Sequence, residues 1–419
     1  MGNADPHGER GILVRKIDVQ NFHRATRDTA REVNRRIILS LLRDQGPVSR
    51  AELARLMGAP RGMITSMVNE LLEEGLVAEG ATASTPRGRR PTLLHLRSHD
   101  RLAIGVDIRA SRTAVQLCDF GGEPLECREF PTPDSPEEFV RALGRRVAEL
   151  RRPAGEVGTL EGVGVVVPGM VDGRSGRVLN APTLGWRDVD LQCALEDGTG
   201  LPVHIERDAV ACAMARMWLG AHRQEGTGDF VYLIVSEGVG VGLVVNGQVV
   251  RGRSFTAGEF GHVPLDLDGP PCSCGGRGCL EAFVSDPATV ARYLDPASTG
   301  RKAGSGRGEG IPRIGEIIAL ARAGDPAARH AVETTGRYLG VGLAAIVNAL
   351  NPGLIVVGGE IVGAWDLLAP VIQAEVAART LTAAAAATPI GIDPDHADTR
   401  LRGAAALVVA PAFAAPQIA

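Results

Sequence analysis

The sequence predicts an α/β protein that has a small N-terminal domain of three helices and a β-hairpin and a large domain of two α/β lobes. Three observations predict it. Apolar residues follow helical spacing before about residue 76, hairpins followed by helices occur twice after residue 100, and the chain has 419 residues. Because single cores stop growing at roughly 250 to 300 residues, more than one domain is needed. We expect a tail over residues 1–25, a first domain over 26–97 and a second over 98–419.

The composition is that of an ordinary globular protein. Hydrophobic residues make up 44% and charged residues 22% of the chain. No uninterrupted apolar run approaches the ~20 residues that a membrane helix needs, and the longest candidate, 381–389, is an alanine tract that is too short. Residues 1–24 mix both charges and lack the apolar stretch of a secretory signal. We therefore expect a cytoplasmic protein without a membrane partner.

Charge is distributed unevenly along the chain. Residues 1–100 contain 16 Lys and Arg against 12 Asp and Glu, whereas the whole chain has a net charge of -4. A basic N-terminal domain joined to an acidic body is typical of a nucleic-acid-binding domain attached to another domain. Many solvated helical surfaces have a similar excess, so the charge alone does not decide.

Capping residues divide the first hundred residues into three helices. Apolar residues at helical spacing predict a first helix around 37–42, which ends before Gly46-Pro47. Ser49 fits the N-cap of a second helix with Glu52 as its capping-box partner, and Gly58 fits the position after its end. Pro60 then opens a third helix that Gly75 closes, with a buried stripe at Ile64, Met67, Val68, Leu71 and Leu72.

The second and third helices, with the short turn between them, match the helix-turn-helix that places its second helix in the major groove of DNA. Residues 76–78 and 92–96 read as two strands that enclose a basic loop, which makes the hairpin a wing. Side chains able to bond bases or phosphates face outward on the third helix and at the wing tip: Arg61, Thr65, Ser66, Asn69, Arg87, Arg89 and Arg90. The alternative is a protein-interaction module of three helices and a hairpin.

The rest of the chain contains two similar series of elements. The first has strands at 102–108, 113–119 and 126–130, a helix at 136–150 and a buried strand at 163–167. The second has strands at 230–236, 240–245 and 248–251, two helices and a strand at 354–357 before a helical C-terminus. Two α/β halves predict two lobes with a cleft between them, a common place for ligands. A stretch rich in Gly, Ser and Arg at 296–310 is expected to be a mobile insertion.

Residues 30–415 resemble the ROK family of repressors, open reading frames and sugar kinases. The most specific motif is Gly258-Glu-Phe-Gly-His262 followed by Cys272-Ser-Cys-Gly-Gly-Arg-Gly-Cys-Leu-Glu281. The resemblance implies an actin-like, hexokinase-like (ribonuclease H-like) ATPase fold of two lobes, and the repressor branch of the family has an N-terminal winged helix. It also implies a homodimer or a homotetramer.

One histidine and three cysteines in the same motif predict a metal site. His262, Cys272, Cys274 and Cys279 have the spacing H-x9-C-x-C-x4-C, in a chain whose odd number of seven cysteines argues against a disulfide framework. One imidazole and three thiolates suit a tetrahedral structural zinc ion without an open position for catalysis. Free thiols on a loop are the alternative. The family resemblance implies that zinc shapes a sugar-binding loop spanning 258–281.

The resemblance also assigns the sugar-binding residues. Ile205-Glu-Arg-Asp-Ala-Val210 matches the family stretch with the catalytic aspartate, which puts Asp208 in the position of the general base. Sugar hydroxyls would also contact Gly258, Glu259, His262 and Glu281. Two family asparagines are replaced here by Thr183 and Arg207. A cation at Arg207 would favour a phosphorylated or acidic sugar, unless it pairs with Glu206 or faces solvent.

The phosphate-binding loops depart from the kinase pattern. The family's Asp-x-Gly-Gly-Thr is replaced by Asp107-Ile-Arg-Ala-Ser111, so two glycines that allow backbone to approach phosphate are lost. The family's Gly-Thr-Gly is replaced by Ser236-Glu-Gly238, which places a negative charge where ATP phosphates would bind. The pair Gly358-Gly359 persists, although a strand-to-helix turn explains it equally well.

Three functions remain open at this point. The sequence favours a repressor that binds pseudo-palindromic, double-stranded operator DNA as an oligomer and senses a sugar or sugar phosphate without phosphorylating it, with Asp208 a vestigial base. The alternative is an active ATP-dependent sugar kinase with an appended DNA-binding domain, which the retained Asp208 supports. A DNA-binding protein whose large domain ignores ligands is the third, and Thr183 and Arg207 support it.

Overall fold

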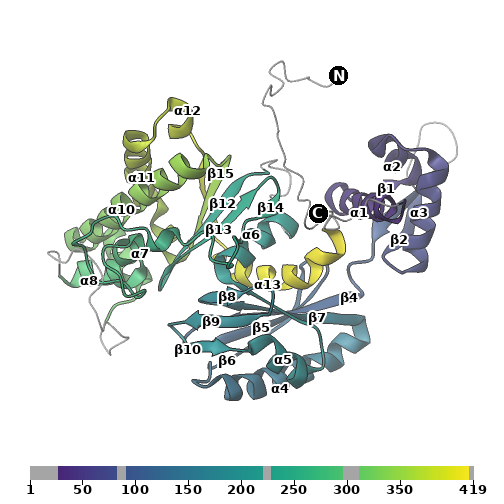
Figure 1. Ribbon diagram of the computed structural model, residues 1–419, viewed down its shortest axis with the longest axis horizontal. Coiled ribbons are helices and arrows are strands. Elements are labelled where there is room, and N and C mark those ends of the chain that lie inside the picture. The colour runs from purple at the N-terminus through teal and green to yellow at the C-terminus, as the bar shows by residue number, and fades with distance from the viewer. Residues whose placement is uncertain (1–26, 83–90, 220–227, 296–310, 415–419) are drawn as a thin grey trace. The chain divides into compact units, whose positions relative to one another are not determined.

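The computed structural model describes residues 27–82, 91–219, 228–295 and 311–414 (Figure 1). The chain divides into two compact units, one of residues 1–96 with 412–419 and one of residues 97–411. The wing-tip residues Arg87, Arg89 and Arg90 and the expected insertion at 296–310 lie outside the described residues.

The first unit contains three helices and a three-stranded antiparallel sheet. Its strands follow the order β1-β3-β2, with Val48 opposite Leu94 and Val77 opposite Leu96. The elements are α1 (Arg27–Gln45), β1 (Val48–Ser49), α2 (Arg50–Met57), α3 (Arg61–Glu73), β2 (Val77–Thr82) and β3 (Thr92–Leu96). The apolar stripes predicted from helical spacing meet in its core, where Ile38, Leu53, Ile64, Val68, Leu71 and Leu94 are fully buried.

Capping explains where α2 and α3 begin and end. The Ser49 side chain accepts a hydrogen bond from the Glu52 N–H at 3.2 Å, and Gly58 adopts the left-handed conformation at the end of α2. The predicted capping box is incomplete, because the Glu52 carboxylate pairs with Arg55 instead of the Ser49 N–H. Pro60 is the residue before α3 and not its first residue.

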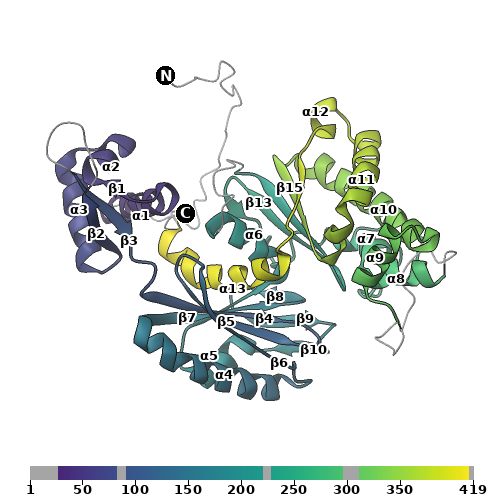
Figure 2. The same ribbon diagram turned by 180° about the vertical axis from the view of Figure 1, so that it is seen from behind.

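The first half of the second unit is a mixed sheet in the order β11-β7-β4-β5-β6. In Figure 2, α4 and α5 cover one face of this sheet and α13 lies on the other. A separate small sheet has the order β10-β9-β8. The elements are β4 (Arg101–Ile108), β5 (Thr113–Asp119), β6 (Pro124–Phe130), α4 (Pro136–Val157), β7 (Thr159–Val167), β8 (Met170–Asp172), β9 (Arg177–Ala181), β10 (Trp186–Val189), α5 (Leu191–Thr199) and β11 (Val203–Arg207).

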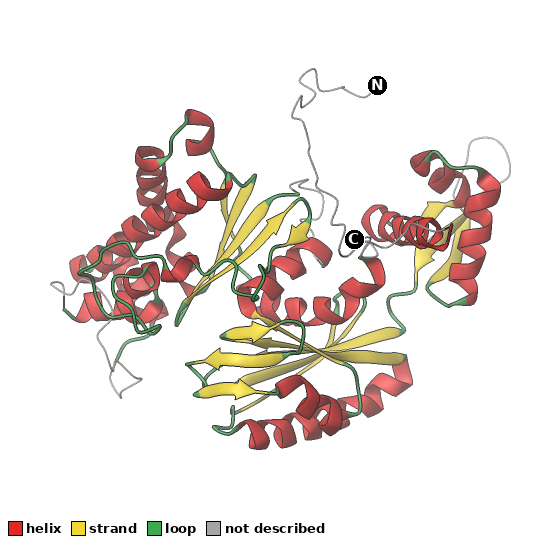
Figure 3. Cartoon of the chain, in the orientation of Figure 1, coloured by secondary structure: helices red, strands yellow, loops and turns green. Residues whose placement is uncertain are grey.

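The second half repeats the arrangement with a sheet in the order β14-β13-β12-β15-β16 (Figure 3). Its strands are β12 (Phe230–Val235), β13 (Val239–Val245), β14 (Gln248–Val249), β15 (Leu354–Gly358) and β16 (Ile390–Ile392). The helices that follow β11 in the chain are α6 (Asp208–Trp218), α7 (Leu280–Val284), α8 (Asp286–Leu294), α9 (Ile314–Arg322), α10 (Pro326–Leu350), α11 (Trp365–Arg379), α12 (Ala383–Ala386) and α13 (His396–Phe413), with 3-10 turns at Phe260–His262 and Glu360–Ala364. The repeated series therefore confirms the predicted α/β fold.

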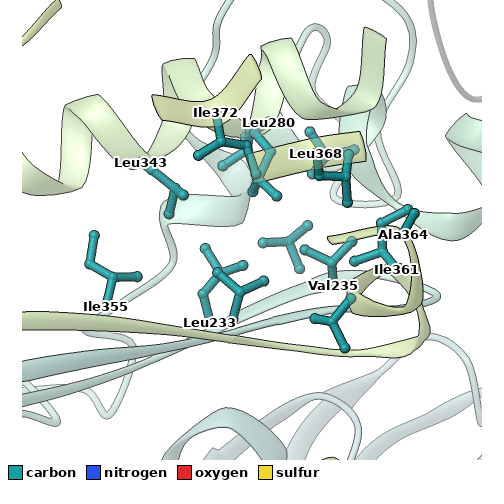
Figure 4. Close-up of a cluster of buried hydrophobic side chains, with 14 of the residues drawn as sticks. Leu233, Val235, Leu280, Leu343, Ile355, Ile361, Ala364, Leu368 and Ile372 are labelled. Atoms are coloured by element: carbon teal, nitrogen blue, oxygen red, sulfur yellow. The ribbon is translucent and has the colours of Figure 1, made fainter. Parts of the chain in front are cut away.

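Helices α7, α9, α10 and α11 share one hydrophobic core with the second sheet. Strand residues Leu233, Val235 and Ile355 face helix residues Leu280, Leu343, Leu368 and Ile372, as Figure 4 shows. All seven are at most 1% exposed. This packing fixes the position of α7, whose first turn follows the cysteine motif directly.

Among the described residues, one helical stretch, Glu360–Arg379, is long and apolar enough to cross a membrane by length and composition. It is not an uninterrupted apolar run, because Asp366 and Glu375 lie within it. Its buried residues Leu368, Ile372 and Val376 belong to the core described above, and α11 packs along α10. A core helix passes the same test, and these contacts assign the stretch that role.

Candidate functional site

The outward face of α3 contains the residues predicted to contact DNA. Arg61, Thr65, Ser66 and Asn69 are all exposed, while Ile64, Met67 and Val68 on the opposite face are buried. Thr65 donates to the Arg61 carbonyl at 2.9 Å, and Asn69 accepts a long bond of 3.4 Å from Arg50. These polar side chains make few strong internal bonds, which leaves them able to bond a nucleic acid.

The zinc-motif residues converge to one point. The nearest ligand atoms of His262, Cys272, Cys274 and Cys279 all lie within 4.8 Å of one another. The Cys274 and Cys279 sulfurs are 3.8 Å apart, and Cys272 Sγ lies 3.5 Å from His262 Nδ1. Sulfurs bound at ~2.3 Å at two corners of a tetrahedron would lie about 3.8 Å apart. The four groups are thus arranged to hold a metal ion.

Glycine allows the cysteine loop to close on itself. Gly278 has a φ of +63°, and a Cβ atom there would lie 1.5 Å from the carbonyl oxygen of Asp266. The loop is further held by short antiparallel bridges, Pro264 with Cys279 and Pro271 with Arg277. Burial and the neighbouring thiols of Cys272 and Cys274 raise the pKa of Cys279 to about 12, so binding of a cation would be needed to ionise this thiol at neutral pH.

Glu281 connects the metal cluster to the second sheet. It is 6% exposed and the second residue of α7. One carboxylate oxygen accepts from Ser273 Oγ at 2.5 Å and contacts Cys272 Sγ at 3.6 Å, and the other accepts from the Val239 N–H at 3.1 Å. The predicted sugar ligand Glu281 is thus mostly engaged by the protein.

The remaining sugar-side residues form a chain of contacts that ends at the metal cluster. Arg207, which is 6% exposed, pairs with Glu259 and also donates to the Ala257 carbonyl. The other Glu259 oxygen lies 3.9 Å from His262 Nε2, while His262 Nδ1 faces Cys272. Because Glu259 balances the Arg207 charge, the positive charge that would attract a sugar phosphate is largely neutralised. The sequence reasoning considered Glu206 as its partner, but Glu206 pairs with Arg251.

Gly258 packs closely against a strand, whereas Thr183 is exposed. Gly258 has a φ of +93°, and a Cβ atom there would lie 2.6 Å from the Val241 carbonyl oxygen, so glycine is required for packing on β13. Thr183 is exposed in the turn between β9 and β10. The structure therefore brings Arg207, Glu259, His262 and Glu281 around the metal cluster and leaves Thr183 at the surface.

Asp208 is the first residue of α6 and lies where β11 ends. Its Oδ1 accepts from the Ala209 N–H at 2.7 Å, and its Oδ2 accepts from Arg400 at 2.8 Å. The side chain is 18% exposed, so solvent or a ligand reaches part of it. Sequence reasoning missed Arg400, since no local motif indicated a residue 192 positions further along the chain.

The loop Ser236-Glu-Gly238, where the family resemblance places a phosphate-binding loop, contains one acidic residue and lies next to a buried aspartate. The Asp286 N–H donates to the Ser236 carbonyl at 2.8 Å, which places Asp286 against the Ser236-Glu-Gly238 loop. Burial, with Glu360 and Glu237 nearby, raises the pKa of Asp286 well above its ordinary value. The Gly358-Gly359 pair has a packing role, because a Cβ atom at Gly359 would lie 1.7 Å from the Val235 carbonyl oxygen.

Comparison with known proteins agrees with this geometry. The ROK family model matches residues 103–410, and a winged helix-turn-helix DNA-binding model matches residues 31–78. The chain belongs to the ROK family. It is 31% identical over 352 residues to the xylose repressor of Bacillus spizizenii, which covers 83% of this chain and 88% of that relative. It is 27% identical over 365 residues to the N-acetylglucosamine repressor of Escherichia coli O157:H7, covering 85% and 87%.

Two solved structures of the family resemble this chain, one of a transcriptional regulator and one of a kinase. A ROK family transcriptional regulator, described as a homolog of the E. coli MLC protein, has a TM-score of 0.78 at 25% identity and covers 92% of this chain and 98% of its own. A ROK family glucokinase from Streptomyces griseus, solved with glucose and AMPPNP, has a TM-score of 0.61 at 29% identity and covers 73% and 98%. The family fold and the winged helix-turn-helix predicted from the sequence are confirmed.

Proposed function

We propose that this ROK protein is a cytoplasmic transcription repressor of carbohydrate metabolism that binds a sugar without phosphorylating it. The observation that supports it most is the combination, in one chain, of an exposed recognition-helix face on α3 with a sugar-side cluster around Glu259 and His262. Relatives named xylose repressor and N-acetylglucosamine repressor match 83% and 85% of this chain, which also supports the proposal.

The DNA-binding part of the proposal places α3 in the major groove of a pseudo-palindromic operator. A homodimer or homotetramer presents two copies of α3 about one helical turn apart, which matches two operator half-sites. Arg61, Thr65, Ser66 and Asn69 contact bases and phosphates there, and Arg87, Arg89 and Arg90 contact the DNA backbone or the minor groove. Footprinting of DNA upstream of sugar-uptake genes and of the protein's own gene tests this directly, and no protected site there would contradict it.

A variant pair tests the role of α3. We expect Arg61→Ala to weaken operator binding by about 1–3 kcal/mol, because a contact to DNA is lost. Arg329→Ala is the matched control, since it removes the same charge from an exposed, ion-paired position on α10. Equal losses of affinity in a gel-shift assay would contradict the assignment.

The metal held by His262, Cys272, Cys274 and Cys279 is proposed to be a structural zinc ion. Three thiolates and one imidazole are the ligands that zinc prefers in closed tetrahedral sites. Bound there, zinc would hold the 258–281 loop so that His262 Nε2 and Glu259 keep their place on the sugar side. Elemental analysis of purified protein is expected to find about one zinc ion per chain.

The sugar is proposed to contact Asp208, Gly258, Glu259, His262 and Glu281, with Thr183 and Arg207 at the positions that differ from the kinases. A ligand that binds only the folded protein raises its melting temperature, so thermal-shift screening of sugars and sugar phosphates identifies the effector. No shift with any of them would favour the ligand-blind alternative. A ligand that releases operator DNA in a gel-shift assay would establish the coupling, because coupling requires a preference for one conformation.

An active sugar kinase is the second candidate function. Asp208 retains the position of the base, and the S. griseus glucokinase shares the fold of the large unit. Against it, Arg109 and Ala110 replace glycines of the first phosphate loop, and Glu237 adds an acidic side chain to the second. ATP-dependent turnover of a sugar that Asp208→Asn abolishes would establish the kinase.

A further inference from the structure

A single buried arginine joins the two aspartates of the kinase-like unit. Arg400 Nε donates to Asp107 Oδ1 at 2.8 Å, and Arg400 Nη1 donates to Asp208 Oδ2 at 2.8 Å. The exposed fractions of the side chains are 7% for Arg400, 2% for Asp107 and 18% for Asp208. The guanidinium therefore lies directly between the carboxylate at the end of β4 and the carboxylate at the start of α6.

Close packing of α13 fixes this arginine in place. A Cβ atom would lie 2.7 Å from the Leu401 carbonyl oxygen if placed on Gly105, and 1.8 Å from the Ala404 carbonyl oxygen if placed on Gly164. On the other side of the helix, a Cβ atom at Gly403 would lie 2.5 Å from the Ala211 carbonyl oxygen. Glycine thus lets α13 lie directly against β4, β7 and α6, as Figure 1 shows, and Arg400 is held between them.

Each oxygen of the two carboxylates already has a donor. Asp107 Oδ2 accepts from Arg109 Nε at 2.8 Å, and Asp208 Oδ1 accepts from the Ala209 N–H at 2.7 Å. Two guanidinium groups balance two carboxylates, so the cluster is neutral without any ion. Burial acts to lower the pKa of Arg400, but Asp107 and Asp208 outweigh it and raise the pKa above its ordinary value. Arg400 is therefore a permanent cation.

A nucleotide-bound magnesium ion does not fit this arrangement. Magnesium takes oxygen ligands at about 2.1 Å in octahedral geometry, and a kinase uses carboxylates to hold it against the ATP phosphates. Here the carboxylate oxygens that would ligate it are bonded to protein donors, and the cation position is filled by a guanidinium. Displacing Arg400 would leave a buried charge without a partner, which is strongly unfavourable.

We propose that Arg400 permanently replaces a divalent cation between Asp107 and Asp208. The large unit therefore excludes metal-bound nucleotide, and it binds its ligand without a divalent cation and without a nucleotide. Arg400 is a positioning residue: its Nη1 bonds to Asp208 Oδ2 and fixes the orientation of this carboxylate. That this carboxylate then accepts a sugar hydroxyl depends on the proposed function, whereas the exclusion of the cation does not.

Binding of Mn²⁺ to zinc-loaded, full-length protein tests the exclusion, with Mn²⁺ as a paramagnetic probe for Mg²⁺ sites. Free Mn²⁺ measured by electron paramagnetic resonance should not decrease when wild-type protein is added. Arg400→Ala should bind about one equivalent, because Asp107 Oδ1 and Asp208 Oδ2 lose their shared donor and become free to ligate a hard ion. Adding Asp208→Asn to that variant should abolish the binding. Arg402→Ala, on the same helix, is the matched control and should behave as wild type.

Two results would overturn the proposal. One is Mn²⁺ binding by the wild-type protein that Asp107→Asn abolishes. The other is a folded Arg400→Ala protein that binds no Mn²⁺. If circular dichroism shows that Arg400→Ala does not fold, Arg400→Met keeps the side-chain length, and Mn²⁺ should raise the melting temperature of this variant but not that of the wild type. No such rise would equally overturn it.

The same samples separate this inference from the proposed function. If a sugar raises the melting temperature of the wild type, the rise should be unchanged by ATP and Mg²⁺. A rise that requires both would overturn the inference. If no sugar has an effect, the proposed function fails, while the Mn²⁺ result still decides the role of Arg400.

Discussion

The metal cluster and the Asp107–Arg400–Asp208 cluster lie in the same unit but differ in what occupies their centre. In the metal cluster, one ligand atom from each of four residues lies within 4.8 Å of the others, an arrangement that suits a metal ion. In the second cluster, two carboxylates converge on a position that a side chain of the protein already fills. Under the proposed function, the fold keeps the part that would shape a sugar-binding loop and closes the part that a phosphoryl transfer would need.

If the proposed function holds, the difference explains how a kinase-like fold can serve as a receptor. A kinase requires both a sugar pocket and a metal-nucleotide site, whereas a receptor requires only the pocket. Here the glycines that pack α13 on β4 and α6 bring position 400 close to both aspartates, and Arg400 bonds to each of them. The predictions below test this contrast, from the largest expected effect to the smallest.

Loss of one metal ligand should have the largest effect. We expect Cys272→Ser to remove the bound metal and to unfold the 258–281 loop, because binding of a structural ion contributes directly to folding. Cys193→Ser is the control, since Cys193 is an exposed cysteine of α5. Metal content and the melting temperature measure the effect. Equal metal content in both variants would show that the four ligands do not form the site.

Loss of one partner in the Asp107–Arg400–Asp208 cluster should have the second-largest effect, a loss of stability. Asp107→Ala leaves the buried Arg400 with less compensation and is expected to lower the free energy of unfolding by about 3–5 kcal/mol. Glu129→Ala breaks an exposed pair with Arg112 and should cost only about 0–1 kcal/mol. Urea unfolding compares the two. Similar values would mean that the buried cluster contributes little to stability.

Substitution of Glu259 should change the relative affinities of the protein for a neutral sugar and for its phosphate. Wild-type protein should prefer a sugar over its phosphate, because Glu259 balances Arg207. Glu259→Gln frees the guanidinium and should shift the ratio of the two affinities toward the phosphate by roughly tenfold. Calorimetry with a sugar and its phosphate checks the change. An unchanged ratio would show that Arg207 does not face the ligand.

His396 should produce the smallest effect, as a pH dependence of stability. Burial, together with Arg109, lowers the pKa of His396 from its ordinary value of 6.5. The unfolded chain therefore takes up a proton before the folded protein does, and stability is lost as the pH falls below about 6.5 toward the folded pKa. His396→Gln should reduce this slope, whereas the exposed His330→Gln should not. Urea unfolding between about pH 5 and pH 7 measures it.

Local sequence signals predicted the elements and the metal cluster well. Ser49 and Gly58 determine the ends of α2 because a capping side chain and a left-handed residue act within one helical turn. The spacing from His262 to Cys279 predicts that the four side chains converge, and they do, because the four residues lie in one short segment. Such features depend on residues that are close in the sequence.

Long-range ion pairs could not be predicted in the same way. Arg400 reaches Asp107 across 293 positions, and Arg207 reaches Glu259 across 52. Both pairings depend on how helices and sheets pack. The sequence alone therefore predicted an effect of the Arg207 charge on the ligand without indicating that Glu259 pairs with it. The Asp107–Arg400–Asp208 cluster can therefore be recognised only from the tertiary structure.

One measurement tests the account most directly: formation of ADP by wild-type protein with ATP, Mg²⁺ and a panel of sugars, with the melting temperature recorded in the same samples. The account predicts that at least one sugar raises the melting temperature and that none stimulates formation of ADP. Sugar-dependent formation of ADP that Asp208→Asn abolishes would contradict it.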